Sequence, residues 1–203
     1  MTESTRTLET LELVGGVLCL DFVNTINSRL NPEHDYLMQY SDVVRWAKKL
    51  DILSLTQTNQ LQKRAKQNAG EAESASLAAR TLRDLLYRLF SKAAKGAEPD
   101  KKDVEIFVVF YGESISCSQL IKKGTHYRTA WKLDETLDAV LWPIVHSAGE
   151  LLRSDELAHV KECPGCGWLF LDTSKNQSRR WCSMNTCGAR DKMRRYHKKQ
   201  RAK

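Results

Sequence analysis

Four cysteines near the end of the chain constrain its fold more than any other feature of the sequence. Cys163 and Cys166 are separated by two residues, and after a gap of fifteen residues Cys182 and Cys187 form a second pair. The turn-forming residues 164–165, Pro-Gly, close the first pair. Thiolates paired at these spacings are typical of a tetrahedral zinc site. The sequence therefore predicts that one structural Zn²⁺ holds the C-terminal region together.

Three other uses of these cysteines fit less well. A secreted disulfide-rich domain would carry an apolar export segment, and the N-terminal stretch MTESTRTLETLELVGG has none. A redox C-x2-C motif would leave the second pair of cysteines unexplained. A catalytic zinc site keeps one position open for water, whereas four thiolates fill all four positions. We therefore expect the zinc ion to be structural.

The region around the cysteines predicts a small domain that folds only with its metal. A module of about forty residues buries too little apolar surface to fold alone, and zinc ligation contributes roughly 10–16 kcal/mol in such peptides. Residues 168–171 are predicted as a strand and residues 179–181 as its return strand. A helix is predicted to begin near Cys187, capped by Asn185 or Thr186. Knuckle, hairpin and helix in this order predict a treble-clef-like finger.

The C-terminal helix is predicted to be strongly basic. Residues 161–203 carry twelve lysines and arginines against three acidic residues, so the excess charge of the chain, formally +7, lies in this region. Met193, Tyr196 and Gln200 share one side of the helix, which we expect to pack on the finger. Concentrated positive charge indicates a phosphate backbone as partner. The residues predicted to contact nucleic acid are Lys175, Arg179, Arg180, Arg190, Arg194, Arg195, Lys198 and Lys199.

This region resembles the CGNR zinc finger of bacterial proteins. In that family a C-x2-C pair, an F-x-D-x-S stretch and R-R-W-C precede the motif that gives the family its name, and here the last two stand at residues 170–174 and 179–182. The naming motif stands at residues 187–190, with Ala189 where the family has Asn. Any base contact or helix cap made by that Asn in relatives is therefore absent. The resemblance implies a DNA-binding finger.

The first part of the chain predicts a larger, mostly helical domain with a small antiparallel sheet. Residues 11–22 are predicted to begin as a strand and to turn at residues 15–16, Gly-Gly. We therefore expect an α+β protein divided into residues 1–154 and residues 155–203. Helices are predicted over 41–50, 56–68, 71–95, 100–112 and 134–152, with Asp134 as a cap and Pro143 in the first turns or at a kink, and strands over 114–120 and 126–133.

Residues 15–25, GGVLCLDFVNT, followed by residues 40–46, resemble the opening of the ABATE domain that usually precedes the CGNR finger. This resemblance implies a stress-linked transcription regulator whose first domain senses a signal or forms dimers. Asp21 and Asn24 end an apolar run, so they are candidates for lining a ligand pocket. Short polar side chains at such a place also cap or bridge the local backbone, and that interpretation stays open.

Several classes of protein are not supported by the sequence. It has no glycine-rich phosphate loop, nucleophile elbow, H-E-x-x-H motif or convincing carboxylate pair, so we do not expect an enzyme. No apolar run is long enough to span a membrane. Zinc thiolates and two further unpaired cysteines, Cys19 and Cys117, fit a reducing cytoplasm, where we expect the protein to associate with the nucleoid. We expect both of these cysteines to be buried.

These observations predict a DNA-binding transcription regulator with an N-terminal domain that binds an unknown small-molecule effector or forms a homodimer. Two alternatives stay open. The basic helix would serve RNA or the ribosome as well as DNA, and the finger would also serve as a protein-interaction or purely structural module.

Overall fold

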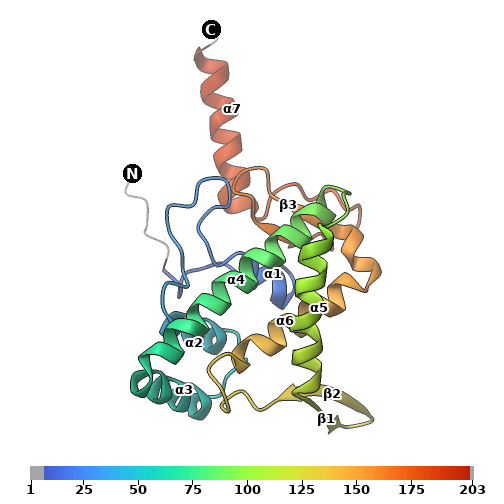
Figure 1. Ribbon diagram of the computed structural model, residues 1–203. Coiled ribbons are helices and arrows are strands. Elements are labelled where there is room, and N and C mark those ends of the chain that lie inside the picture. Colours follow the sequence, from blue (N-terminus) through green and yellow to red (C-terminus); the bar gives the residue numbers. More distant parts are fainter. Residues whose placement is uncertain (1–6, 202–203) are drawn as a thin grey trace.

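A computed structural model describes residues 7–201 of the chain. This part of the protein is mainly helical and contains two small antiparallel sheets, which confirms the predicted α+β class (Figure 1). The elements are α1 (Leu18–Val23), α2 (Tyr40–Lys49), α3 (Leu55–Gln67), α4 (Ala69–Ala94), α5 (Lys101–Ser116), β1 (Ser118–Lys123), β2 (His126–Trp131), α6 (Trp142–Leu152), β3 (Val160–Glu162), β4 (Leu169–Leu171) and α7 (Ala189–Arg201), with short turns η1 (Ala139–Leu141), η2 (Asp155–His159) and η3 (Met184–Gly188).

Helix α4 is the central element of the fold. It contains 26 residues, crosses the molecule from edge to edge, and contacts α1, α2, α3, α5 and β3 (Figure 1). Its buried side chains recur at helical spacing, because Leu82, Leu85, Leu86, Leu89 and Phe90 lie along one face. The apolar periodicity of this stretch was the strongest helical pattern in the sequence. No helix within residues 7–201 is long and apolar enough to cross a membrane.

The structure has no strand at residues 11–14, where one is predicted, and the apolar run after the predicted turn at residues 15–16 forms a helix. Residues 18–23 are α1, and the turn before them is closed by the Gly15 N–H, which donates to Asp21 Oδ1 at 2.8 Å. A Cβ at Gly15 would lie 2.6 Å from the Asp21 nitrogen, so this turn needs glycine. The turn folds the chain back onto the helix, and a strand cannot continue through it.

Helix α6 begins later than predicted. Asp134 does not cap it, because the helix starts at Trp142 with Pro143 in its first turn, one of the two positions expected for that proline. Proline lacks an N–H and its ring clashes with the carbonyl four residues earlier, so a helix from residue 134 cannot pass through it. The preceding residues form the short turn η1. Strands β1 and β2 pair as the predicted hairpin, and β2 lies within its predicted range, but β1 begins four residues later than predicted because α5 continues to Ser116.

The C-terminal region packs directly on the helical domain, and one buried cluster extends from Leu8 to Cys187. Asn24 joins the two parts, because its Oδ1 accepts the Leu169 N–H at 2.9 Å and its Nδ2 donates to the Leu169 carbonyl at 2.8 Å. Nearby, Trp168 Nε1 donates to the Ile26 carbonyl at 2.7 Å, and the Arg29 N–H to the Cys166 carbonyl at 2.7 Å. These bonds fix the finger against the loop that follows α1.

Replacing Asn24 by alanine should lower the free energy of unfolding by about 2–4 kcal/mol, because it leaves a buried N–H and a buried carbonyl without partners. Urea unfolding monitored by circular dichroism measures the loss. Asn31→Ala, which removes an exposed amide, is the matched control and should cost less than about 0.5 kcal/mol. Equal losses in the two variants would contradict the bridging role of Asn24.

Candidate metal centre and basic helix

The first cysteine pair lies in the turn between β3 and β4. The two strands pair antiparallel, with Val160 opposite Leu171 and Glu162 opposite Leu169. Within the turn, the Cys163 carbonyl accepts the Gly167 N–H at 2.8 Å, and Gly167 adopts a left-handed φ of 74°. Glycine occupies that conformation without strain. The turn directs the Cys163 and Cys166 side chains to the same place.

The second cysteine pair flanks the turn η3, which leads into α7. Cys182 precedes the turn and Cys187 lies in it, and the Gly188 N–H closes it by donating to the Ser183 carbonyl at 3.0 Å. The predicted caps Asn185 and Thr186 therefore lie inside this turn rather than at the start of α7.

The four sulfur atoms form one buried cluster. They all lie within 4.8 Å of one another, and the Sγ atoms of Cys166 and Cys182 are 3.6 Å apart. Tetrahedral zinc with bonds of about 2.3 Å to sulfur requires sulfur–sulfur distances of about 3.8 Å. The cluster matches that requirement, and residues 7–201 add no fifth Cys, His, Asp or Glu ligand to it. The centre therefore suits one structural zinc ion.

Repulsion among the four thiolates also favours a bound cation. The neighbouring sulfurs, Cys163 first and then Cys166, raise the pKa of the Cys182 thiol well above its ordinary value. Four buried thiolates at these distances repel one another, so they ionise together only around a metal ion. One positive group lies beside them, because Arg190 Nη2 is 3.4 Å from the Cys187 sulfur.

The predicted return strand at residues 179–181 is wrong, because β4 pairs with β3 and the following chain turns around Asp172. This buried carboxylate accepts hydrogen bonds from Lys161 Nζ at 2.6 Å, from the Ser174 N–H at 3.0 Å and from the Arg179 N–H at 3.0 Å. Burial opposes ionisation, but these donors outweigh it and hold the pKa of Asp172 below its ordinary value. Hydrogen bonds to the Asp172 side chain, rather than pairing between strands, therefore hold this segment of the chain.

The basic residues of this turn differ in how far their side chains are exposed to solvent. Arg179 folds inward, with its guanidinium 4.4 Å from the centre of the Phe170 ring, and it donates to the carbonyls of Trp181 and Cys182. Arg180 is exposed and lies over the Trp181 ring. Lys175 is exposed at the tip of the turn. Arg179 thus supports the metal loop from within.

Helix α7 projects away from the rest of the molecule (Figure 1). Asp191 is its one buried residue, and it pairs with Arg194 at 2.7 Å and with Arg195 at 3.0 Å. The predicted packing of Met193, Tyr196 and Gln200 on the finger is wrong, because all three are exposed. The helix extends beyond the small finger, which is too short to cover it. Lys198 and Lys199 lie on its exposed outer half.

The two candidate pocket residues serve the backbone. Asn24 binds Leu169, as described above, and Asp21 accepts the Gly15 N–H. Burial raises the pKa of Asp21 to about 6, against the opposing effect of its bond with Gly15.

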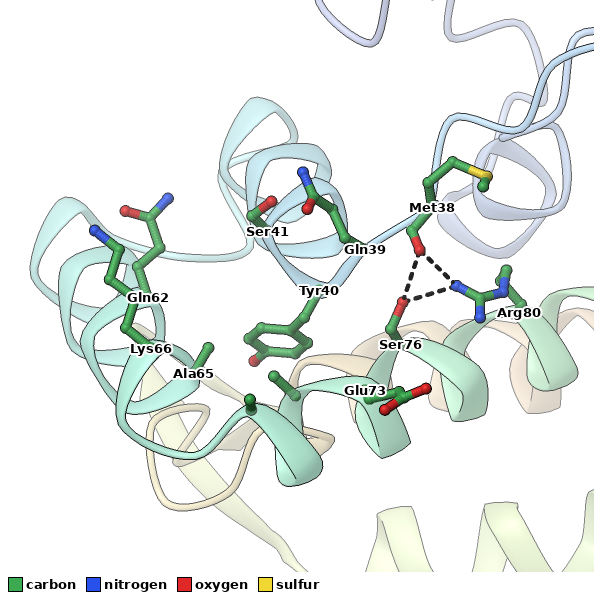
Figure 2. Close-up of a pocket in the computed structure, with 12 residues that line it drawn as sticks. Met38, Gln39, Tyr40, Ser41, Gln62, Ala65, Lys66, Glu73, Ser76 and Arg80 are labelled. Atoms are coloured by element: carbon green, nitrogen blue, oxygen red, sulfur yellow. Dashed lines mark hydrogen bonds between the residues drawn. The ribbon is translucent and has the colours of Figure 1, made fainter.

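A groove of about 570 Å³ lies elsewhere, between α2, α3 and α4 (Figure 2). Figure 2 shows Arg80 on one wall, where it donates to the Met38 carbonyl at 2.9 Å and to Ser76 Oγ at 2.8 Å. Residue patterns gave no sign of this groove, because its lining comes from three helices. Other side chains that line it are Gln39, Tyr40, Gln62, Ala65, Lys66 and Glu73.

Comparison with protein families gives two matches. The model of the CGNR zinc finger matches residues 159–200. The model of ABATE, described as "Putative stress-induced transcription regulator", matches residues 16–155. A search of curated proteins found no match to the chain.

Cys182→Ser should abolish the metal centre, since it leaves three sulfurs and removes most of the roughly 10–16 kcal/mol that ligation contributes in zinc-finger peptides. Mass spectrometry of the metal should find one zinc per chain in the wild type and a much lower content in the variant. Limited proteolysis of the variant should then cut the chain within the finger, on the C-terminal side of residue 163. Cys117→Ser is the matched control and should keep the full zinc content, because Cys117 is not part of the cluster. Cys117 is exposed, so the prediction that it is buried is wrong. Full zinc content in Cys182→Ser would overturn the assignment.

The raised pKa of Asp21 predicts a pH-dependent stability. Because the folded-state pKa of Asp21, about 6, lies above its ordinary value of 3.8, the folded state binds the proton more tightly, and stability falls as the pH rises from about 4 to about 6. Asp21→Asn removes this titration. The variant should therefore gain roughly 2–3 kcal/mol relative to the wild type over that window.

Denaturant unfolding of both proteins at each pH measures this difference in the free energy of unfolding. The contributions of all other ionisable groups are common to both proteins and cancel. The exposed substitution Asp134→Asn should follow the wild-type profile. A constant difference between wild type and Asp21→Asn would show that the Asp21 carboxyl does not titrate in this range.

Proposed function

The chain belongs to the ABATE family, and from that membership we propose that it is a transcription regulator that binds duplex DNA through helix α7. The proposal assigns the zinc ion a structural role and assigns the protein no catalytic activity. The zinc centre fixes the start of the helix, and the helix supplies the contacts.

The observation that carries this proposal is the exposure of a densely basic helix. Seven of the thirteen residues of α7 are lysine or arginine and one is acidic. Isolated helices of this length are marginal in water, and like charges along them add repulsion. With Asp191 as its one buried side chain, α7 gains little from packing. A polyanion that neutralises the lysines and arginines would stabilise the helix, which supports a nucleic acid as partner.

The shape of α7 favours DNA over double-stranded RNA. A helix of thirteen residues is about 20 Å long, and with its side chains it is about as wide as the major groove of B-form DNA. The major groove of A-form RNA is deep and narrow and does not admit it. A folded RNA with a widened groove stays open as an alternative partner, and the experiment below distinguishes it from DNA.

The basic residues divide into supporting and contacting roles in this proposal. Arg190 lies beside the Cys187 sulfur and helps to set the start of the helix, and Arg179 supports the metal loop. Arg194 and Arg195 are held by Asp191 and reach phosphates from there. The contacts assigned to exposed side chains are those of Lys175, Arg180, Lys192, Lys198, Lys199 and Arg201.

The N-terminal domain has the regulatory role in this proposal. The groove between α2, α3 and α4 has mixed charge and an apolar wall, so it is the place we assign to a small-molecule effector. Asp21 and Asn24 are committed to backbone bonds and receive no such role.

Reversing charge at the outer end of α7 should weaken DNA binding. With about five phosphates neutralised, log Kd should change with log salt with a slope of about 4 to 5. The double variant Lys198→Glu, Lys199→Glu should lower that slope by about 2, and weaken binding at least tenfold at low salt. Fluorescence anisotropy with a labelled duplex measures both quantities.

The matched control reverses two exposed lysines outside α7, Lys63 on α3 and Lys92 on α4, and should leave the slope near the wild-type value. Competition with unlabelled duplex DNA and structured RNA at equal salt separates the two nucleic acids. Tighter binding of RNA, or equal effects of the two double variants, would overturn the assignment of α7 to DNA.

A further inference from the structure

Helix α5 has an apolar face that nothing in the described chain covers. Its inner side is formed by Asp103, Phe107 and Ser114, which are buried. On the outer side Val108 is 60% exposed and Val109 is 71% exposed. A helix that packs on one side only normally carries polar residues on the other, whereas one that is apolar all round is normally buried. The outer face of α5 therefore has the composition of an interface.

A glycine in the middle of this face gives an independent indication. Gly112 lies inside α5, where glycine costs about 1 kcal/mol relative to alanine. Apart from its chain neighbours and the backbone of its own helix, no atom of the described chain lies within 4 Å of the position that its Cβ would take, and its φ is not positive. Nothing within residues 7–201 requires a glycine here. Close approach of a second helix does require one, because small residues let helix axes approach to about 8 Å.

The outer face is complementary to itself. Lys101, Val104, Val108, Gly112 and Ile115 follow one another at intervals of three or four residues and form one stripe. The intervals are symmetric about Val108. Two antiparallel copies of α5 related by a twofold axis at that residue bring Val108 against its own counterpart. In the same arrangement Val104 lies over the partner subunit's Gly112.

From this symmetry we propose that the outer face of α5 is a homodimer interface, occupied by α5 of a second copy of this chain. Charge agrees with the arrangement. Lys101 lies 3.8 Å from Glu105 in its own chain, so this pair adds no net charge to the face.

The available surface is large enough for a stable dimer. Of sixteen exposed large apolar side chains in the described chain, eight lie between residues 104 and 127, on α5 and the hairpin that follows it. Leu120 and Tyr127 of the hairpin continue the face beyond the end of α5. A standard interface uses about 20–30 residues and about 800 Å² per partner. Eleven residues of α5 and ten of the hairpin, residues 119–128, are exposed, which reaches the lower end of that residue count.

Sedimentation equilibrium of the full-length, zinc-loaded protein tests the proposal without nucleic acid, so the result is independent of the proposed DNA binding. The wild type should have twice the chain mass of 23.2 kDa at micromolar concentration. Val108→Asp places two carboxylates together at the twofold axis and should weaken the dimer by about 100-fold or more. Leu77→Asp, at an exposed apolar position of α4, is the matched control and should stay dimeric.

Gly112→Leu separates the interface from folding. Leucine is a better helix former than glycine, and no neighbouring atom of the chain obstructs it, so the folded monomer should be no less stable. The same side chain fills the space that the partner subunit's Val104 needs, so the dimer should weaken at least tenfold. A monomeric wild type, or undiminished dimers of folded Val108→Asp and Gly112→Leu, would overturn the proposal. A face that captures a different protein would give the first of these results.

Discussion

Mutual repulsion among four buried thiolates is the constraint on which the C-terminal part of this protein depends. The sulfur atoms lie within 4.8 Å of one another, and no protein cation other than the exposed Arg190 is bonded to them among the described residues. A divalent ion converts that repulsion into ligation and thereby joins the β3–β4 turn to the turn before α7. The direction of α7 follows from this junction, since the helix makes almost no other contact with the molecule.

The finger does not stand alone on its metal. Asn24, Ile26 and Arg29 bind the backbone or a side chain of the knuckle region, so the loop after α1 and the finger fold as one unit. Arg29 also donates to Asp84 of α4 at 2.7 Å, which links the same loop to the central helix. A change in the helical domain therefore has a direct path of bonded groups to the root of α7. That path is a physical basis for regulation of a helix that itself contacts little.

The sequence predicted the parts of this structure that depend on local pattern. Cysteine spacing identified the metal ligands, and helical periodicity identified α2, α3 and α4 to within a few residues. It failed where distant groups decide the outcome. Residues 11–14 are predicted as a strand, but no described strand pairs with them, and the Leu11 carbonyl accepts a hydrogen bond from Lys49 of α2 instead. The inward position of Arg179 depends on Phe170 and on carbonyls of the metal loop, and a charge count cannot separate it from an exposed arginine.

The proposed homodimer would strengthen the proposed binding of α7 to DNA. One basic helix of thirteen residues would bind a single DNA site loosely, at the micromolar level or above that non-specific contacts provide. A homodimer presents two such helices, and the second then binds at an effective concentration near millimolar, without any new contact. The finger is bonded to the helical core, so the distance between the two α7 helices is set by the α5 interface. Half-site spacing on DNA would then be fixed by residues far from the bases, so α5 would influence the choice of DNA site without touching DNA.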